Sequence, residues 1–181
     1  MPRPGAVINE YAPGNIKLAH RTPWNSSDDE LLFLKQIGLR WVRLEYGSQD
    51  PGVDALRKVQ KRFSGFGLQV HGAVQEAYRS LKIQLGQPGR DQDIETYRTF
   101  LRSLGALGVP VAAYDFHPAN TYTTAVVERR GYRAREFNLH DFRTKVEKQR
   151  FDREYSAEEI WAHYTYFMKA ILPVAEEAGV K

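Results

Sequence analysis

Polar side chains that could carry out chemistry lie within or directly after several apolar stretches of the sequence. A histidine can transfer a proton near neutral pH, an arginine can hold a substrate carboxylate in a fork, and a carboxylate can orient either group. The candidates for substrate binding are His20, Arg21, Glu45, His71, Tyr114, Asp115 and His117. If the stretches that carry them are parallel strands, their carboxyl ends meet at one edge, where ligands bind in α/β folds. We therefore expect His20, Glu45, His71 and Asp115 to open on one common face.

The elements that must position these residues alternate between strands and helices. Expected strands cover residues 16–20, 39–46, 68–74 and 109–116. Ser27 and Glu30 form a capping box that opens a helix ending at Gly38, and a second helix covers residues 54–63. Asp91 is expected to cap a third helix. Ser156 and Glu159 form a second capping box, which opens the longest helix.

One joint recurs along the chain: a helix end, a glycine and an apolar strand. Its glycines are Gly38, Gly67, Gly108 and Gly179. Strand and helix alternation with right-handed crossovers predicts a parallel sheet. We expect an α/β fold with about four parallel units of a TIM barrel in one domain, residues 1–181, with a fifth strand beginning near Lys181. The alternative is a complete small open sheet.

Composition excludes several classes of site. The chain has 181 residues, a net charge of +4 and no cysteine, so disulfides, thiol nucleophiles and cysteine metal sites are excluded. No apolar run is long enough to span a bilayer and the first residues lack a signal-peptide pattern, which favours a cytoplasmic protein without membrane contact. The whole net charge lies between Glu128 and Arg153, and no basic face extends it, so nucleic-acid binding is not expected. The three strand-end histidines lie on different strands, and their spacing does not predict a metal site.

Three segments resemble mannonate dehydratases, which are xylose-isomerase-like TIM barrels. Residues 81–91 with residues 94–97 resemble the family's "IKLGLPxRDxxIxNY" stretch, residues 114–118 its "YNFMP" and residues 171–181 its "VIPVAEEAGVK". The resemblance covers mainly residues 81–181. It implies the N-terminal part of a barrel that dehydrates D-mannonate to 2-dehydro-3-deoxy-D-gluconate with Mn²⁺ or another divalent ion. It also implies that residues 119–155 are a basic insertion placed to cover the site.

The chain departs from this family at several positions. Asp115 stands for the family's Asn, His117 for its Met, and Gln75 and Ser80 for a Glu and a His after the third strand. The family's metal-binding "HPDDPP" motif follows the fifth strand, beyond Lys181. The alternatives are therefore a sugar isomerase or epimerase on the same barrel, or a non-catalytic half-barrel. Under the mannonate dehydratase interpretation as well as under these alternatives, we expect a homo-oligomer or a complementary second half as partner, and no turnover by these 181 residues alone.

Overall fold

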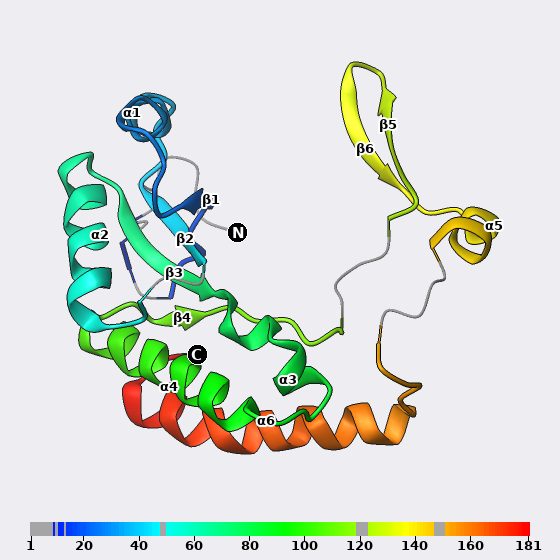
Figure 1. Ribbon diagram of the computed structural model, residues 1–181. Helices are drawn as coiled ribbons and strands as arrows, with labels where there is room; N and C mark the ends of the chain where they lie inside the picture. Colours follow the sequence, from blue (N-terminus) through cyan, green and yellow to red (C-terminus); the bar gives the residue numbers. More distant parts are fainter. Residues whose placement is uncertain (1–8, 10, 13, 48–49, 119–122, 147–150) are drawn as a thin grey trace.

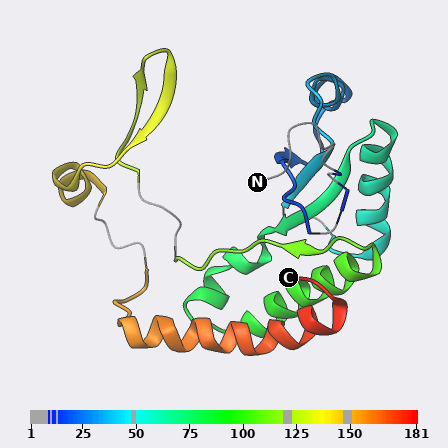
Figure 2. The same cartoon turned by 180° about the vertical axis from the view of Figure 1, so that it is seen from behind.

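The computed structural model describes residues 9, 11–12, 14–47, 50–118, 123–146 and 151–181. Four parallel strands form one sheet in the order β1-β2-β3-β4, as the alternating pattern predicted. Their helices lie along one side of the curved sheet (Figure 1), and the reverse view agrees (Figure 2). The strands are β1 (Ala19–Pro23), β2 (Trp41–Gly47), β3 (Gln69–Gln75) and β4 (Val111–Ala112), and the helices between and after them are α1 (Asp28–Gln36), α2 (Val53–Gly65), α4 (Arg90–Ala106) and α6 (Ala157–Ala178).

The core lies between the sheet and these helices. Along β2, buried residues Val42, Leu44 and Tyr46 alternate with half-buried ones, so one face of the strand packs on helices while the other carries Arg43 and Glu45. The helices contribute buried aromatic and aliphatic side chains, namely Leu31, Leu34, Leu56, Phe63, Ile94, Tyr97, Phe100, Leu101, Leu104, Phe167 and Ile171. The polar face of β2 therefore lies on the side of the sheet that faces away from these helices.

The helix starts follow the capping chemistry of the sequence, with one exception. Ser27 and Glu30 cap each other's backbone N–H groups at α1, and Ser156 and Glu159 do the same at α6. The expectation that Asp91 caps α4 is wrong, because Gly89 in a left-handed conformation occupies the cap and Asp91 lies within the first turn. There the negative charge of Asp91 interacts favourably with the positive end of the helix dipole, although its side chain makes no capping hydrogen bond.

All four strands differ from their expected bounds, β2 and β3 by one or two residues at each end and the first and fourth strands by more. The first covers Ala19–Pro23 rather than residues 16–20, so His20 and Arg21 lie inside it. The fourth is limited to Val111–Ala112, although the Ala113 N–H still donates to the Ala73 carbonyl at 2.9 Å. Asp115 and His117 therefore lie on an extended segment after β4 and are not part of the ladder.

Lys181 lies beside β4 in the arrangement of a fifth parallel strand. Its N–H donates to the Pro110 carbonyl at 2.9 Å, and its carbonyl accepts from the Ala112 N–H at 2.8 Å. Two such bonds flanking Val111 are the pattern of a parallel pair. The end of α6 leads into this position through Gly179, whose left-handed conformation caps the helix.

Short elements connect the larger ones. A 3-10 turn (η1, Glu76–Arg79) and a short helix (α3, Leu81–Gln84) follow β3. After β4, an antiparallel hairpin of β5 (Ala125–Arg129) and β6 (Tyr132–Glu136) is followed by α5 (Leu139–Asp141) and a π-helical turn (η2, Phe142–Val146). The hairpin and α5 stand apart from the sheet and its helices (Figure 1). Residues 119–122 and 147–150 of the expected insertion lie outside the described residues.

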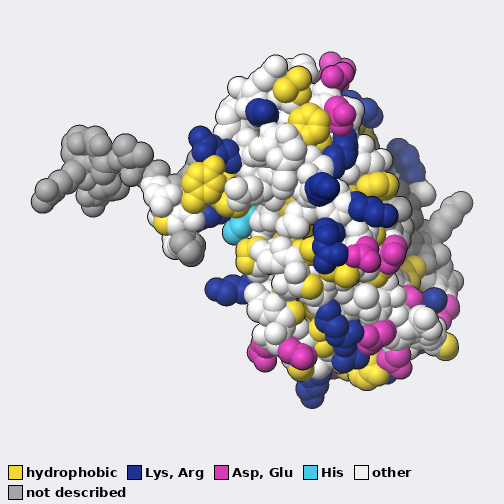
Figure 3. Space-filling model, turned by 90° about the vertical axis from the view of Figure 1, so that its left-hand side faces the viewer, with side chains coloured by type: hydrophobic (Ala, Val, Ile, Leu, Met, Phe, Trp, Pro, Cys, Tyr) yellow, Lys and Arg dark blue, Asp and Glu magenta, His cyan; other side chains and the backbone are white. Residues whose placement is uncertain are grey.

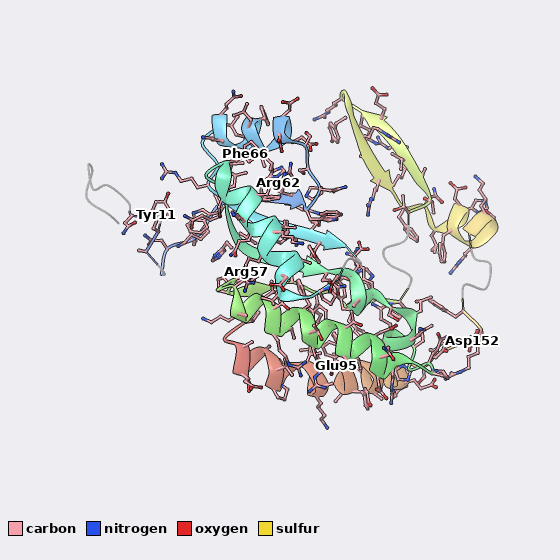
Figure 4. The ribbon with its side chains drawn as sticks, turned by 60° about the vertical axis from the view of Figure 1, so that its left-hand side comes forward. Tyr11, Arg57, Arg62, Phe66, Glu95 and Asp152 are labelled. Carbon is pink, nitrogen blue, oxygen red and sulfur yellow. The ribbon has the colours of Figure 1, made fainter. Side chains whose placement is uncertain are left out.

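The helix-covered side carries charges of both signs. Figure 3 shows positive and negative side chains interspersed on the side where α1 and α2 lie. Arg57 and Arg62 extend from α2 and Glu95 from α4 (Figure 4). Arg62 donates to Asp28 at 2.5 Å and so connects α2 to the start of α1. Among the described residues, no helix is long and apolar enough to cross a membrane.

Candidate functional site

A polar cavity of about 240 Å³ lies where the strands end at their carboxyl side. All four strands or the segments that follow them contribute to its wall. The lining residues are Arg21, Arg43, Glu45, Gly47, Val74, Glu76, Tyr78, Arg79, Ala113, Tyr114 and Asp115. Arg21, Glu45, Tyr114 and Asp115, which the sequence singled out, are thus brought together at this end of the sheet.

Two guanidinium groups share one carboxylate at the β1–β2 end of the cavity. Arg21 and Arg43 are register partners on neighbouring strands, which places like charges side by side. Glu45, two residues after Arg43 and on the same face, forms ion pairs with both of them, at 3.1 Å from Arg43 Nη2. One carboxylate for two guanidiniums leaves a net positive charge here, and the Arg21 side chain is 67% exposed. This end can bind an anion such as a carboxylate.

Asp115 organises the opposite end of the cavity. Its Oδ2 accepts hydrogen bonds from Tyr78 Oη at 3.1 Å and from Arg79 Nη2 at 2.9 Å. Burial, together with the negative charge of Asp115, raises the pKa of Tyr78 to about 12, so its hydroxyl stays protonated and donates at neutral pH. The hydrogen bond to Asp115 raises the pKa of Arg79. With Glu76 also in the wall, this end has one more acid than base.

His117 lies beside Asp115. Its Nε2 is 3.3 Å from Asp115 Oδ1, and its side chain is 43% exposed. Within the described residues, neither Asp115 Oδ1 nor His117 Nδ1 has a hydrogen-bond partner, although both atoms are buried. Buried polar atoms are nearly always paired in folded proteins, so these two atoms are exceptions, although the His117 ring gives Asp115 Oδ1 a close contact through Nε2.

The two other histidines that the sequence singled out, His20 and His71, do not line the polar cavity. His20 Nδ1 is 3.0 Å from the Thr22 hydroxyl, and His20 is not in the cavity wall. His71 stacks edge-on against Trp41 and lines a different cavity, and burial lowers its pKa. The expectation that His71 shares one opening with Glu45 and Asp115 is therefore wrong, because β3 bulges next to Val42 and changes the register at His71.

Tyr114 lies between this cavity and a second, aromatic-lined one. Its hydroxyl is 3.0 Å from that of Tyr164 on α6. Burial and this hydrogen bond raise the pKa of Tyr114 to about 12. Tyr114 therefore connects the site to the long helix as a neutral hydrogen-bonding group.

Three residues of the site were missed by sequence reasoning. Arg43 carries a recognisable signal, because it stands two residues before Glu45 and therefore on the same face of a strand. Arg79 and Tyr78 lie in η1, four and three residues after β3, and no periodic pattern marks them. Their role depends on the path of a turn, which the sequence alone does not specify.

The two positions where the resemblance places a Glu and a His have structural roles. The Gln75 side chain is buried and accepts from the Ala77 N–H at 2.9 Å, which caps η1. Ser80 donates to Asp93 and accepts from the Lys82 N–H. Across the part of the chain that the structure describes, no group of three or more histidine, aspartate or glutamate side chains could hold a metal ion. The described residues therefore do not provide a ligand set for the divalent ion that the resemblance implies.

Comparisons with known proteins identify relatives of this chain. It is 33% identical over 124 aligned residues to a mannonate dehydratase of Streptococcus pneumoniae, covering 55% of this chain and 34% of that protein. It is 26% identical over 193 aligned residues to mannonate dehydratase 2 of Halalkalibacterium halodurans, covering 81% of this chain and 56% of that protein. The chain thus spans between a third and somewhat more than half of the curated relatives it matches. No family model matches it.

Several solved structures have a fold similar to that of this chain. The crystal structure of mannonate dehydratase from Streptococcus suis superposes with a TM-score of 0.76 and 27% identity, covering 93% of this chain and 52% of that one. D-psicose 3-epimerase from Clostridium cellulolyticum gives a TM-score of 0.52 at 13% identity, which shows a shared fold alone. In sequence and in fold, this chain is therefore similar to about half of a mannonate dehydratase, as its motifs predicted, and its parallel units are those of a TIM barrel.

Proposed function

We propose that this chain forms the carboxylate-binding part of a sugar-acid lyase site of the mannonate dehydratase type. The reaction would remove water from D-mannonate to give 2-dehydro-3-deoxy-D-gluconate. The observation that supports this proposal is the two-ended cavity, which has an excess of guanidinium at β1–β2 and an excess of carboxylate at η1 and the segment after β4. A sugar acid has the matching polarity, because its carboxylate is at one end and hydroxyl groups follow along its chain.

The residues of the cavity have separate tasks in this proposal. Arg21 and Arg43 bind the substrate carboxylate in place of part of their contact with Glu45. Tyr78, Arg79 and Asp115 fix the polar wall that faces the hydroxyl groups. The divalent ion of the family would supply charge stabilisation in the complete site, but the described residues do not fit it. Sugar-acid binding by this chain is therefore expected to depend on the side chains of Arg21 and Arg43.

The experiment is calorimetric titration of residues 1–181 with D-mannonate and, separately, with neutral D-fructose. We expect D-mannonate to bind and the Arg21→Gln variant to bind it about tenfold more weakly, since a charge-assisted hydrogen bond is lost. Arg57→Gln is the matched control, because Arg57 pairs with Asp54 on the outer side of α2. Equal binding of the neutral ketose would favour the epimerase alternative. Binding of neither sugar would favour a half-barrel that only assembles.

Two further parts of the proposal concern coverage of the site. We propose that residues 119–155, which include the basic β5–β6 hairpin, act as a lid over the cavity. We also propose that a second copy or a complementary half covers the outer edge of β1, since among the described strands only β2 pairs with β1. Light scattering at increasing protein concentration tests the second point, and a concentration-independent monomer mass would contradict it.

A further inference from the structure

We propose that the aromatic cavity beside the polar one binds the arm of a second copy of this chain, so that two copies exchange arms. The arm is defined as residues 123–146, which comprise the β5–β6 hairpin, α5 and η2. The aromatic cavity has a volume of about 860 Å³, and its wall includes Tyr114, Phe116, Tyr155, Ile160, Trp161 and Tyr164. The contact itself goes beyond the proposed function, because it involves no sugar.

The aromatic cavity presents a continuous surface of exposed rings. Trp161 is 66% exposed. Its ring centroid lies 5.6 Å from that of Tyr164, which in turn lies 5.2 Å from the ring of Phe116. Exposed apolar patches mark interaction sites, and Trp and Tyr are among the residues that dominate binding energy at protein interfaces. The cavity therefore has the composition of a docking site for apolar side chains.

The arm carries apolar side chains that need a surface to pack on. Four of them are more than half exposed, namely Val126, Tyr132, Phe137 and Leu139. The hairpin register places Tyr132, Ala134 and Val127 on one face. Among the described residues, β5 and β6 pair only with each other, and Figures 1 and 2 show the arm standing away from α6. Because an isolated two-stranded hairpin is only marginally stable in water, this apolar face favours a partner.

The charges of the two surfaces are complementary. The arm, residues 123–146, carries six basic and three acidic side chains, a net charge of +3. Residues 151–159, which lead into α6 at the rim of the aromatic cavity, carry four acidic side chains and one basic side chain, a net charge of −3. Complementary potentials speed association and fix the orientation of two proteins. A basic arm would thus meet an acidic rim around the aromatic contact.

The position of the arm favours a second copy over the chain's own cavity. The arm extends away from the start of α6 in both views (Figures 1 and 2), so it is already placed to reach another molecule. Exchange of identical segments forms the same contact twice about a twofold axis and closes the assembly as a dimer. Tyr114 lines both the aromatic and the polar cavity. The lid of the polar cavity would then come from the other copy, a consequence that rests on the proposed function.

Disulfide cross-linking tests the contact directly, because the chain has no cysteine of its own. Ala134→Cys puts a thiol on the arm face that carries Tyr132, and Ala157→Cys puts one in the wall of the aromatic cavity. The two single variants are mixed and oxidised, with one of them lengthened by a tag, and we expect a mixed dimer. Lys61→Cys, at an exposed position of α2, replaces Ala157→Cys as the control and should give none.

The same thiols distinguish exchange from closure within one chain. If a chain that carries both Ala134→Cys and Ala157→Cys forms only an internal disulfide, and the mixed single variants form no dimer, the arm closes on its own cavity. That result would overturn the inference.

Sedimentation equilibrium measures the contribution of each surface. We expect Trp161→Ala and Tyr132→Ala each to weaken self-association about tenfold. Both side chains are exposed, so both variants should fold, which unchanged thermal midpoints would verify. Leu172→Ala, which removes another exposed apolar side chain of α6 outside the cavity, is the matched control and should associate like the native chain. The two effects should not add in the double variant, since both substitutions remove one contact.

Three results of these experiments separate the inference from its rivals. Added salt should weaken self-association of the native chain, because it screens the attraction between arm and rim. Self-association that is equal in Trp161→Ala and the native chain would overturn the inference and favour a contact elsewhere, such as the β1 edge. D-mannonate binding without arm exchange would refute the inference alone, whereas arm exchange without D-mannonate binding would support it and refute the proposed function.

Discussion

Gly105 of α4 lies directly against the backbone of Ala178 at the end of α6. A Cβ atom added to Gly105 would lie 2.5 Å from the Ala178 carbonyl oxygen and 2.8 Å from its Cβ. Such distances are far inside van der Waals contact, and backbone atoms cannot rotate away. The two helices therefore approach each other this closely because position 105 has no side chain.

Gly105→Ala is expected to destabilise the protein by about 1–3 kcal/mol, because overpacking outweighs the better helix propensity of alanine. Gly65→Ala, at the end of α2, is the matched control: nothing lies within 4 Å of the added Cβ, so its stability should stay equal or rise slightly. Urea unfolding followed by circular dichroism measures both. Equal stabilities of the two variants would contradict the close contact.

Glu45→Gln is expected to strengthen binding of D-mannonate and to make it more dependent on salt. The change removes the carboxylate that Arg21 and Arg43 share, so an incoming carboxylate no longer competes with it. Calorimetry at low and high ionic strength provides the measurement. Glu95→Gln is the control, since Glu95 also bridges two arginines, Arg98 and Arg102, but on the outer side of α4 (Figure 4). Weaker binding in Glu45→Gln would show that Glu45 itself contacts the ligand.

Glu159→Gln is expected to lower stability at neutral pH but not in strong acid. The hydrogen bond from Arg153, together with the Ser156 N–H, lowers the pKa of Glu159 from 4.5 to about 2. Because the folded pKa is depressed, the stabilising contribution is present above pH 4.5 and is lost as the pH falls toward 2. The difference in thermal midpoint between the native chain and the variant should shrink over that range. A pH-independent difference would show that the ionised form of Glu159 is not the source of the lost stability.

Removal of divalent ions is expected to leave the affinity of this chain for D-mannonate unchanged. The described residues contain guanidinium groups at the cavity and no cluster of three metal-ligating side chains. Titration after dialysis against a chelator, compared with titration in added Mn²⁺, measures the dependence. Binding that is lost with the chelator and restored by Mn²⁺ would show that the carboxylate is held through an ion instead of through Arg21 and Arg43.

The sequence predicted the sheet order from the alternation of strands and helices, and most helix starts from local capping chemistry. Ser27 and Ser156 each have a glutamate three residues later, and this spacing alone satisfies the first N–H groups of a helix. The failure at Asp91 has the same physical basis. Gly89 can adopt a left-handed conformation that starts the helix earlier, and the sequence pattern does not show which of two competing starts has the lower free energy.

The candidate site could be predicted only in part, because it depends on contacts between distant segments. Parallel strands bring Arg21, Glu45 and Asp115 to one end, which periodicity can anticipate. The bulge in β3 that separates His71 from them lies beside Gly72, and a glycine in a strand can mark a bulge without specifying its position. The contact of Arg79 with Asp115 joins residues 36 positions apart through a turn, so it follows from tertiary structure alone.

The insertion between β4 and α6 separates two elements that belong to the same packing unit. Helix α6 packs on α4 and leads Lys181 to the edge of β4, although the β5–β6 hairpin and α5 intervene in the chain. The entropy of closing such a loop grows only with the logarithm of its length, and each doubling costs about 0.6 kcal/mol. Additions or deletions in the hairpin therefore change the free energy of unfolding little, so this segment can diverge in length and sequence while the α4–α6 contact and the β4 edge stay the same.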